Sequence, residues 1–512
     1  MLVKTYASAV FGINATTITV EVNISTGTKY YIVGLPDNAI KESLQRIETA
    51  IVSIKMRMPR QKIVVNMAPA DIRKEGSAYD LSIAIGILAA SGQLINDEIS
   101  DYIILGELSL DGTIQPIKGA LPISIQAKKE GFKGIILPSA NAREAAIVSN
   151  LAIYGIDSLA DVVRFFESKE DFQPTVVDVR QQFIQRMNNY DVDFSDVKGQ
   201  ENIKRALEIA AAGGHNVILI GPPGAGKTML AKRLPTILPP LTIEESLETT
   251  KIHSVSGHLS AMDSLMTVRP FRAPHHTISN VALVGGGTNP QPGEISLAHN
   301  GVLFLDELPE FQRAVLEVMR QPLESRSIMI SRARFSIEYP ASFMLIAAMN
   351  PCPCGYYNHP DKECICGTAV VQRYLSKISG PLLDRIDLHV EVTPVEFNEL
   401  ANSRAAEKSE AIRNRVIQAR GIQIERFKNS VDMYCNAQMN SSLLREVCHI
   451  DDRGKELLKN AMERLSLSAR AYDRILKVAR TIADMEQSEN IQNSHLAEAI
   501  HFRSLDRENW AG

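Results

Sequence analysis

Residues 216–228 read Asn-Val-Ile-Leu-Ile-Gly-Pro-Pro-Gly-Ala-Gly-Lys-Thr. An apolar run that ends in a glycine-rich turn, followed by Lys227 and Thr228, is typical of a buried strand, a phosphate-binding loop and the start of a helix. The glycines allow backbone N–H groups to turn toward a phosphate chain, and the positive end of the helix faces the same anion. We predict that Lys227 reaches the β- and γ-phosphates of a nucleotide and that Thr228 binds Mg²⁺.

The composition is that of an ordinary globular protein. The chain has 512 residues, of which 45% are hydrophobic and 22% charged. This length allows about three domains. The net charge of −4 means that a nucleic-acid site would have to be a local basic patch. No apolar run approaches the roughly 18 residues of a membrane span, and no signal peptide is evident. We expect a cytoplasmic protein that is not attached to a membrane.

The pattern of elements changes along the chain. Residues 1–167 alternate short strands (17–22, 62–66) with helices (37–54, 80–90) and are predicted to form an α+β domain. Residues 168–193 are polar and are predicted to be a linker with some helix. In residues 194–394, strands and helices alternate around the phosphate-binding loop, which indicates a parallel α/β sheet. Residues 395–512 are predicted to be helical, most clearly at 452–465 and 469–485.

Asp306 and Glu307 follow the apolar run Gly301-Val302-Leu303-Phe304-Leu305. Hydrolysis of a nucleotide requires an acid that holds Mg²⁺ and a neighbouring carboxylate that activates water. We predict the first role for Asp306 and the second for Glu307. The alternative for this pair alone is a helix N-cap, but the upstream loop favours catalysis.

Three later residues are candidates for contacts with the phosphates. Asn350 ends the strand-like run 343–349 and could orient the attacking water, although a turn before Pro351 would explain it as well. Arg385 and Arg470 could each stabilise charge on a transferred phosphoryl group. Taken alone, either arginine fits an ordinary surface residue.

Further stretches carry a family resemblance. Residues 269–277 read RPFRAPHHT, residues 285–287 read GGG, and residues 292–301 read PGEISLAHNG. With the loop and the Asp-Glu pair, they resemble AAA+ ATPases of the magnesium-chelatase-like group, and more narrowly the ComM/YifB family. The resemblance covers nearly the whole chain. It implies an AAA+ core, which is a parallel sheet with a phosphate-binding loop, and a C-terminal helical lid.

The same resemblance implies roles for individual residues. Asn350 matches the first sensor, Arg470 the second sensor, and Arg385 the arginine finger, which acts on the ATP of a neighbouring subunit. An arginine that acts across subunits requires a ring, and the family forms hexamers. Residues 194–200 match the segment that lines the adenine pocket. The predicted nucleotide-binding residues are Gly199, Gln200, Gly221, Pro222, Pro223, Gly224, Ala225, Gly226, Lys227, Thr228 and Met229.

Residues 326–334, Arg-Ser-Ile-Met-Ile-Ser-Arg-Ala-Arg, form a predicted basic hairpin without an acidic residue. In the wider clade, an insertion at this point reaches into the pore of the ring. Strand alternation places Arg332 and Arg334 on one face, where they could contact DNA phosphates. The alternative is a basic hairpin that faces only solvent.

Four of the six cysteines, Cys352, Cys354, Cys364 and Cys366, lie close together in the sequence. Four thiolates on a short loop can form a tetrahedral Zn²⁺ site, although two C-x-C pairs are tighter than the usual spacing. We predict a structural zinc that stiffens the loop 352–366 between Asn350 and Arg385. The alternative is four reduced thiols without a metal.

Residues 104–119 and 134–138 are similar to the proteolytic domain of Lon, an S5-like fold that uses a serine–lysine dyad. Ser77 could supply the serine, but Leu121 stands where the lysine belongs. Leucine cannot act as a base, and Lys118 is out of register. We therefore expect a Lon-like fold without peptidase activity.

The resemblance implies an ATP- and Mg²⁺-dependent homohexameric motor on single-stranded and branched DNA. Its task would be branch migration during natural transformation and recombination, together with recombination proteins. The alternatives are a magnesium-chelatase subunit acting with a porphyrin, a chaperone-like ATPase that remodels a protein partner, and an active Lon-like protease. The sequence does not determine the polarity of translocation.

Overall fold

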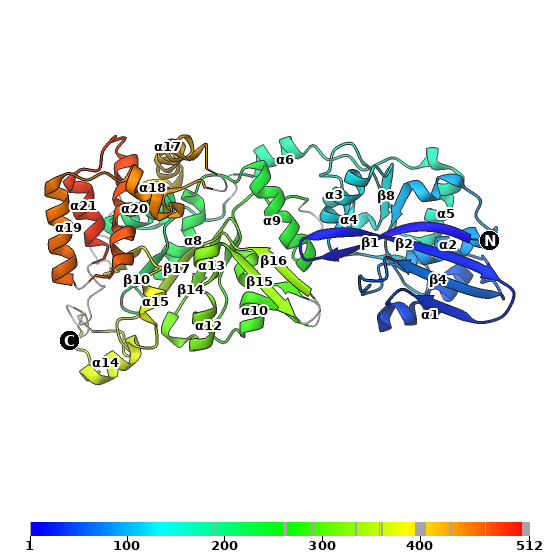
Figure 1. Cartoon of the computed structure of the whole chain (residues 1–512), viewed down its shortest axis with the longest axis horizontal. Coiled ribbons are helices and arrows are strands. Elements are labelled where there is room, and N and C mark those ends of the chain that lie inside the picture. Colours follow the sequence, from blue (N-terminus) through cyan, green and yellow to red (C-terminus); the bar gives the residue numbers. More distant parts are fainter. Residues whose placement is uncertain are drawn as a thin grey trace. The chain divides into compact units, whose positions relative to one another are not determined.

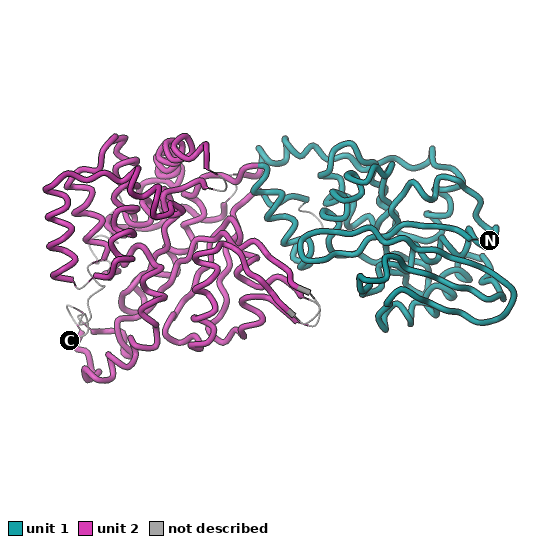
Figure 2. The backbone as a smooth tube through the Cα atoms, in the orientation of Figure 1, with its two compact units in different colours: residues 1–185, 243–266 teal, residues 186–242, 267–512 magenta. Residues whose placement is uncertain are grey.

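The computed structural model describes residues 2–187, 190–259, 264–287, 290–332, 335–357, 359, 362–394, 406–430, 433–465 and 467–503. The chain divides into two compact units (Figure 2). Unit 1 consists of residues 1–185 and 243–266, and unit 2 consists of residues 186–242 and 267–512. Residues 243–266 lie between two parts of unit 2 in the sequence, although the sequence analysis placed them within the ATPase core.

Unit 1 is built on a seven-stranded sheet with the order β3-β4-β2-β1-β5-β8-β9. Strands β1, β2 and β4 pair antiparallel, whereas β5, β8 and β9 continue the sheet in parallel. The strands are β1 (Leu2–Phe11), β2 (Asn14–Ser25), β3 (Tyr30–Val33), β4 (Lys62–Ala68), β5 (Tyr102–Ile104), β8 (Gly134–Leu137) and β9 (Ala152–Gly155), with a small hairpin of β6 (Glu107–Leu108) and β7 (Ile114–Gln115).

The helices of unit 1 include one that is buried along its whole length. Every residue of α2 is buried, and the helix packs on β1 and β2. Gly86 of α2 approaches Val22 so closely that a Cβ would lie 2.6 Å from a Val22 methyl group, so this contact requires glycine. The helices are α1 (Asn38–Ser53), α2 (Asp80–Ala90), α3 (Ala120–Glu130), α4 (Ser139–Ala145), α5 (Leu159–Glu167), α6 (Val179–Arg186) and α9 (Ile243–Ser256).

Helix α9 joins unit 1 through α3. The Gly119 N–H donates to the carbonyl oxygen of Ser254 at 3.2 Å. The Ser254 hydroxyl donates to the buried Glu144 carboxylate at 2.5 Å, and the same carboxylate oxygen accepts the Leu121 N–H at 2.8 Å. Burial raises the pKa of Glu144, although these hydrogen bonds oppose the shift. A segment inserted in the ATPase sequence therefore completes the polar contacts of the first unit.

Unit 2 contains a five-stranded sheet with the order β11-β14-β17-β10-β18, and its neighbouring strands are all parallel. The strands are β10 (Val217–Ile220), β11 (Phe271–Arg272), β14 (Val302–Leu305), β17 (Met344–Met349) and β18 (Leu388–Glu391) (Figure 1). All residues of β10, β14 and β17 are buried, as expected for a parallel sheet with both faces covered. The predicted parallel α/β core is confirmed.

Helices and smaller pairs of strands surround this sheet. Helix α17 packs on α7, α8 and α20, so the helical C-terminal segment lies against the core. The small strand pairs are β12 (Gly285–Gly286) with β13 (Gln291–Pro292) and β15 (Ser327–Arg332) with β16 (Phe335–Pro340). The helices before the C-terminal segment are α7 (Glu201–Gly213), α8 (Lys227–Ile237), α10 (Asn280–Val284), α11 (Glu294–Leu297), α12 (Arg313–Val318), α13 (Pro322–Ser325), α14 (Thr368–Leu375) and α15 (Gly380–Leu383).

The C-terminal segment is helical, as predicted. Its helices are α17 (Ser409–Phe427), α18 (Ser441–Val447), α19 (Asp452–Leu465), α20 (Ala469–Met485) and α21 (Asn493–His501). Ser468 caps α20, because its hydroxyl accepts the Ala471 N–H at 3.2 Å. None of the helices in the described part of the chain is long and apolar enough to cross a bilayer.

Candidate nucleotide site and cysteine cluster

The phosphate-binding loop connects the central strand β10 to helix α8. Gly224 and Gly226 have positive φ angles of 79° and 85°, a conformation that glycine adopts without steric cost. Gly221 lies so close to the chain after β18 that a Cβ would meet the Val392 carbonyl oxygen at 2.2 Å. Glycine is therefore needed at 224 and 226 for the turn, and at 221 for the packing of the sheet.

Lys227 lies at the centre of this site and is almost fully buried. Its Nζ donates to the carbonyl oxygens of Gly221 and Pro222 at 2.7 and 2.9 Å, and to Asn350 Oδ1 at 3.1 Å. Burial lowers the pKa of Lys227, while the nearby carboxylates of Asp306 and Glu307 oppose this shift. The loop lysine and the predicted first sensor, which is 123 residues away, are thus in direct contact.

Thr228 and Asp306 provide neighbouring oxygen atoms. The Thr228 hydroxyl donates to Asp306 Oδ2 at 2.7 Å. A hydroxyl and a carboxylate at the edge of a parallel sheet are hard oxygen donors, which suit Mg²⁺ with its preference for carboxylate, phosphate and water ligands. The two residues therefore fit the ion that the sequence analysis assigned to them.

Glu307 is held in an uncommon backbone conformation, with φ at 54°. Its carboxylate is exposed and lies beside His276, whose Nδ1 is 3.3 Å from Glu307 Oε2. The sequence analysis quoted His276 within a family motif and gave it no role. Because β11 and β14 are parallel neighbours, residues that follow these strands meet at one sheet edge, and this topology could have identified the pair.

Gln200 and Met229 lie next to the phosphate-binding loop. The Gln200 side-chain amide donates to the Ala225 carbonyl at 2.9 Å and to the Thr393 carbonyl at 3.2 Å. Gly199 and Gln200 both have positive φ angles, 63° and 57°. Met229 is partly exposed beside Gly226. These contacts place the predicted adenine-side residues at the loop.

Arg385 precedes β18, Arg470 lies at the start of α20, and both are next to Asp384. Arg385 is buried and forms an ion pair with Glu324 at 2.6 Å. Burial lowers the pKa of Arg385, and Glu324 opposes the shift. The exposed Arg470 lies 4.0 Å from Asp384. The structure thus brings the two predicted arginines together around Asp384, while Lys227, Asp306 and Asn350 form the separate constellation described above.

A buried polar network joins this segment to the lid. Asp387, two residues after Arg385, accepts the Asn216 N–H at 3.0 Å and pairs with Arg474 of α20 at 2.9 Å. His215 lies 3.4 Å from the same carboxylate and contacts Thr481 of α20 at 2.8 Å. Burial would raise the pKa of Asp387, but Arg474 and His215 outweigh it and hold the pKa well below the usual range.

The predicted basic hairpin is present as β15 and β16, paired antiparallel with Arg332 opposite Phe335. Arg332 ends β15, where its backbone alone is described, and Arg334 lies outside the described residues. The predicted contacts of both arginines with DNA stay predictions.

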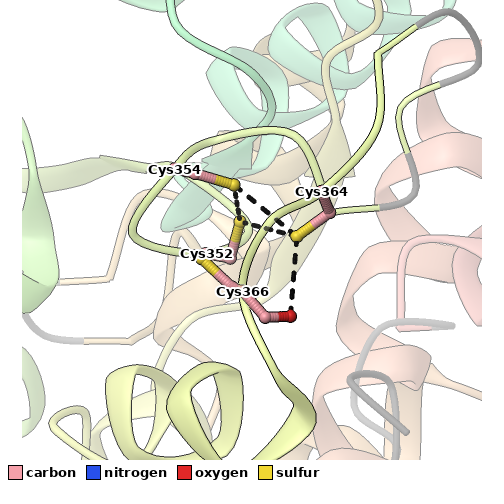
Figure 3. A group of neighbouring side chains, drawn as sticks. All are labelled: Cys352, Cys354, Cys364 and Cys366. Atoms are coloured by element: carbon pink, nitrogen blue, oxygen red, sulfur yellow. Dashed lines mark hydrogen bonds between the residues drawn. The ribbon is translucent and has the colours of Figure 1, made fainter.

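The four clustered cysteines converge on one point (Figure 3). Their sulfur atoms all lie within 4.8 Å of one another. The distances from Cys352 to Cys354, from Cys352 to Cys364 and from Cys354 to Cys364 are 3.3, 3.7 and 3.5 Å. Four sulfurs at about 2.3 Å from a tetrahedral zinc would be separated by about 3.8 Å, so the cluster fits Zn²⁺.

Comparisons with known proteins identify the family. Residues 193–400 match the family model described as magnesium chelatase, subunit ChlI, and residues 406–503 match its C-terminal model. Residues 20–141 match the model described as subunit ChlI of Mg-chelatase. The competence protein ComM of Haemophilus influenzae is 43% identical over 98% of this chain and 97% of its own length. YifB of Escherichia coli is 44% identical over the same shares.

The chain belongs to the ComM/YifB family of magnesium-chelatase-like proteins. This result confirms the resemblance, and membership of this AAA+ family implies an ATPase that uses ATP and Mg²⁺. The magnesium-chelatase subunit ChlI of Cyanidium caldarium is more distant, at 25% identity over 46% of this chain and 65% of its own length.

The comparisons also bear on the first unit of this ComM/YifB protein. Lon protease 2 of Bacillus subtilis is 31% identical over 31% of this chain and 33% of its own length. Leu121, at the position of the Lon lysine, is fully buried at the start of α3, and Ser77 lies before α2. Helix α9 covers the same end of α3 through Gly119 and Glu144. The absence of peptidase activity in this unit stays a prediction.

Proposed function

We propose that this protein is an ATP-driven motor that moves DNA. The observation that carries the proposal is the set of side chains around the phosphate-binding loop: Lys227 contacts Asn350, Thr228 contacts Asp306, and Glu307 follows Asp306. These residue types in this arrangement are those of P-loop ATPases, in which positioning and electrostatics carry most of the catalysis.

Each side chain has a distinct part in hydrolysis. Lys227 neutralises charge on the β- and γ-phosphates, and Asn350 orients the attacking water. Thr228 and Asp306 hold Mg²⁺, which withdraws charge from the phosphates when bound. The exposed Glu307 accepts a proton from the water, and His276 fixes the orientation of that carboxylate.

We infer a homohexameric ring from the roles of the two arginines. Arg385 acts as an arginine finger on the ATP of a neighbouring subunit, and Arg470 acts within its own subunit. In support, Arg385 is held by Glu324, and the neighbouring Asp384 contacts Ser468 at the start of α20 in the lid.

DNA is the substrate that the remaining features favour. The relative ComM is named for competence, and the β15–β16 hairpin carries the arginines predicted to contact phosphates. The task we propose is branch migration on single-stranded and branched DNA during natural transformation and recombination. Recombination proteins are the partners that this task implies.

We also propose that the four clustered cysteines bind a structural Zn²⁺. The donor set is chemically suited to zinc and to no role in hydrolysis, because soft thiolates bind Mg²⁺ poorly.

The test combines ATPase rates with a mass measurement of the assembly. We expect a hexamer whose ATPase rate rises with single-stranded or forked DNA. Glu307→Gln should bind ATP as the unchanged protein does. Its rate of ATP hydrolysis should fall by a factor of about 10²–10⁴, and strand displacement should be lost. Lys227→Ala should lose nucleotide binding as well.

Two other outcomes would replace the proposal. Stimulation by a porphyrin and not by DNA would favour a chelatase-type function. Stimulation by a protein partner alone would favour a remodelling ATPase. Strand displacement retained by Glu307→Gln would refute the mechanism.

A further inference from the structure

The cysteine cluster lies against the nucleotide site. Cys352 and Cys354 lie two and four residues after Asn350, and Asn350 contacts Lys227 at 3.1 Å. Gly355, with φ at 84°, packs on the phosphate-binding loop so tightly that a Cβ would lie 2.5 Å from Pro223 Cδ. The cysteine loop therefore contacts the nucleotide site through two separate points, Asn350 and Gly355.

In the part of the loop that the structure describes, the buried apolar contacts are few. Its apolar cluster consists of Cys352 and Val371, which are buried, with Tyr357 and Leu375 partly buried around them. Burying two or three side chains contributes only a few kcal/mol, which is comparable to the entropy of ordering a few residues. A loop of this length thus needs a covalent or metal crosslink to keep one conformation.

The crosslink cannot be a disulfide in this state, because all four cysteines are free. The sulfurs of Cys352, Cys354 and Cys364 are 3.3–3.7 Å apart, close to the edge of a ZnS₄ tetrahedron, and all four sulfurs lie within 4.8 Å of one another. A metal at this point would fix Gly355 and hence the surface on which Pro223 rests.

We propose that Zn²⁺ bound by Cys352, Cys354, Cys364 and Cys366 holds the phosphate-binding loop in its nucleotide-binding conformation, so that ATP affinity depends on zinc. The proposal rests on ATP binding and on no step that involves DNA. Without the metal, Gly355 no longer packs on Pro223, and Asn350 is no longer held beside Lys227. The phosphate-binding loop then loses its nucleotide-binding conformation.

The first experiment removes the metal from the unchanged full-length protein. Zinc is measured by elemental analysis, and nucleotide affinity by the fluorescence of a labelled, non-hydrolysable ATP analogue. We expect one zinc per chain, and a loss of affinity of roughly tenfold or more after chelation. Affinity should return with Zn²⁺ and not with added Mg²⁺. Purified protein without stoichiometric zinc, or unchanged affinity after chelation, would overturn the proposal.

The second experiment separates the metal from the contact. In Gly355→Ala the ligands are intact, but the new Cβ meets the rigid Pro223 ring. We expect this variant to keep its zinc and to bind the nucleotide analogue several times more weakly. The matched control is Gly367→Ala, at the other end of the loop, where a Cβ meets nothing within 4 Å.

A second control addresses cysteine loss in general. Cys354→Ser should lose both zinc and affinity, whereas Cys448→Ala, a buried cysteine outside the cluster, should lose neither. If Gly355→Ala, Gly367→Ala and the unchanged protein bind the nucleotide analogue equally well, the proposed role of the contact between Gly355 and Pro223 is overturned. Because neither readout uses DNA, a failed DNA motor would leave both results interpretable.

Discussion

His276 is the residue whose function the structure adds to the site. Its Nδ1 lies 3.3 Å from Oε2 of Glu307, the carboxylate that is proposed to activate water. The sequence analysis could assign Glu307 from its place after a strand. It could not assign a role to His276, because positions 276 and 307 are far apart in the sequence. They come together in space through the pairing of β11 with β14.

A variant at His276 tests this pairing. In His276→Ala the Glu307 carboxylate loses its fixed orientation, and we expect kcat for ATP hydrolysis to fall about tenfold with little change in nucleotide affinity. The measurement is steady-state ATPase kinetics beside binding of a labelled nucleotide. His275→Ala serves as the control, because His275 contacts Thr277 rather than the carboxylate. A kcat for His276→Ala within twofold of that of the control would contradict the assignment.

A second prediction at this scale concerns pH. Burial, with the nearby charge of Arg503, lowers the pKa of His389 to about 3, against about 6.5 in an unfolded chain. Because the folded pKa is the lower one, the stabilising contribution is complete above pH 6.5 and is lost as pH falls from 6.5 toward 3. The slope for one such group approaches about 1.4 kcal/mol per pH unit. Denaturant unfolding at pH 7, 6 and 5 measures it, with His389→Gln expected to show a shallower dependence.

Among the elements, the junction between β18 and α20 is the most sensitive to a single change. Asp387 is buried at the start of β18, and its partner Arg474 lies on α20. We expect Asp387→Ala to lower the free energy of unfolding of unit 2 by about 3–5 kcal/mol, because it leaves buried partners uncompensated. Thermal unfolding measures the loss.

A double-mutant cycle separates the pair from general damage to the fold. Arg474→Ala alone should be at least as damaging, because it leaves the fully buried Asp387 carboxylate without its arginine. The double variant should be more stable than the sum of the two losses predicts. Strict additivity would show that Asp387 does not act through Arg474.

The elements themselves were predicted well where their pattern is regular. The predicted helices at 80–90, 452–465 and 469–485 coincide with α2, α19 and α20, because each has a long run of apolar residues or a clear helical spacing. The strand predicted at 17–22 extends to Asn14–Ser25. Its polar ends are in the sheet through pairing with β1, which local sequence does not reveal.

The placement of an element can differ from its place in the sequence. Residues 243–266 follow α8 closely and carry no sign of belonging elsewhere, yet they group with unit 1. The assignment to unit 1 depends on tertiary contacts, such as the hydrogen bond from Ser254 to Glu144, a residue 110 positions away. For the same reason, the neighbourhood of Arg385 and Arg470 around Asp384 could be anticipated only from the family and not from spacing.

For the whole molecule, the docking of α9 gives a testable expectation. Ser254→Ala removes the hydroxyl that donates to the buried Glu144, which should cost about 1–3 kcal/mol locally. We expect faster amide hydrogen exchange along α9 and at the start of α3. Ser256→Ala on the same helix is the matched control, because its hydroxyl donates to the carbonyl of His253 within the helix. Equal exchange in the two variants would contradict a role for Ser254 in docking.

The return of the chain to unit 1 also has a consequence for how the protein is made. Synthesis begins at the N-terminus, so the strands of the seven-stranded sheet emerge well before α9 does. Until residue 254 emerges, Glu144 lacks its Ser254 partner, and by then β10 and α8 of the second unit have already emerged. The two units must therefore mature in an interleaved order, and not one after the other as most tandem domains do. A fragment that stops at residue 185 would be an unfinished body, and its poor solubility would be the simplest sign of this dependence.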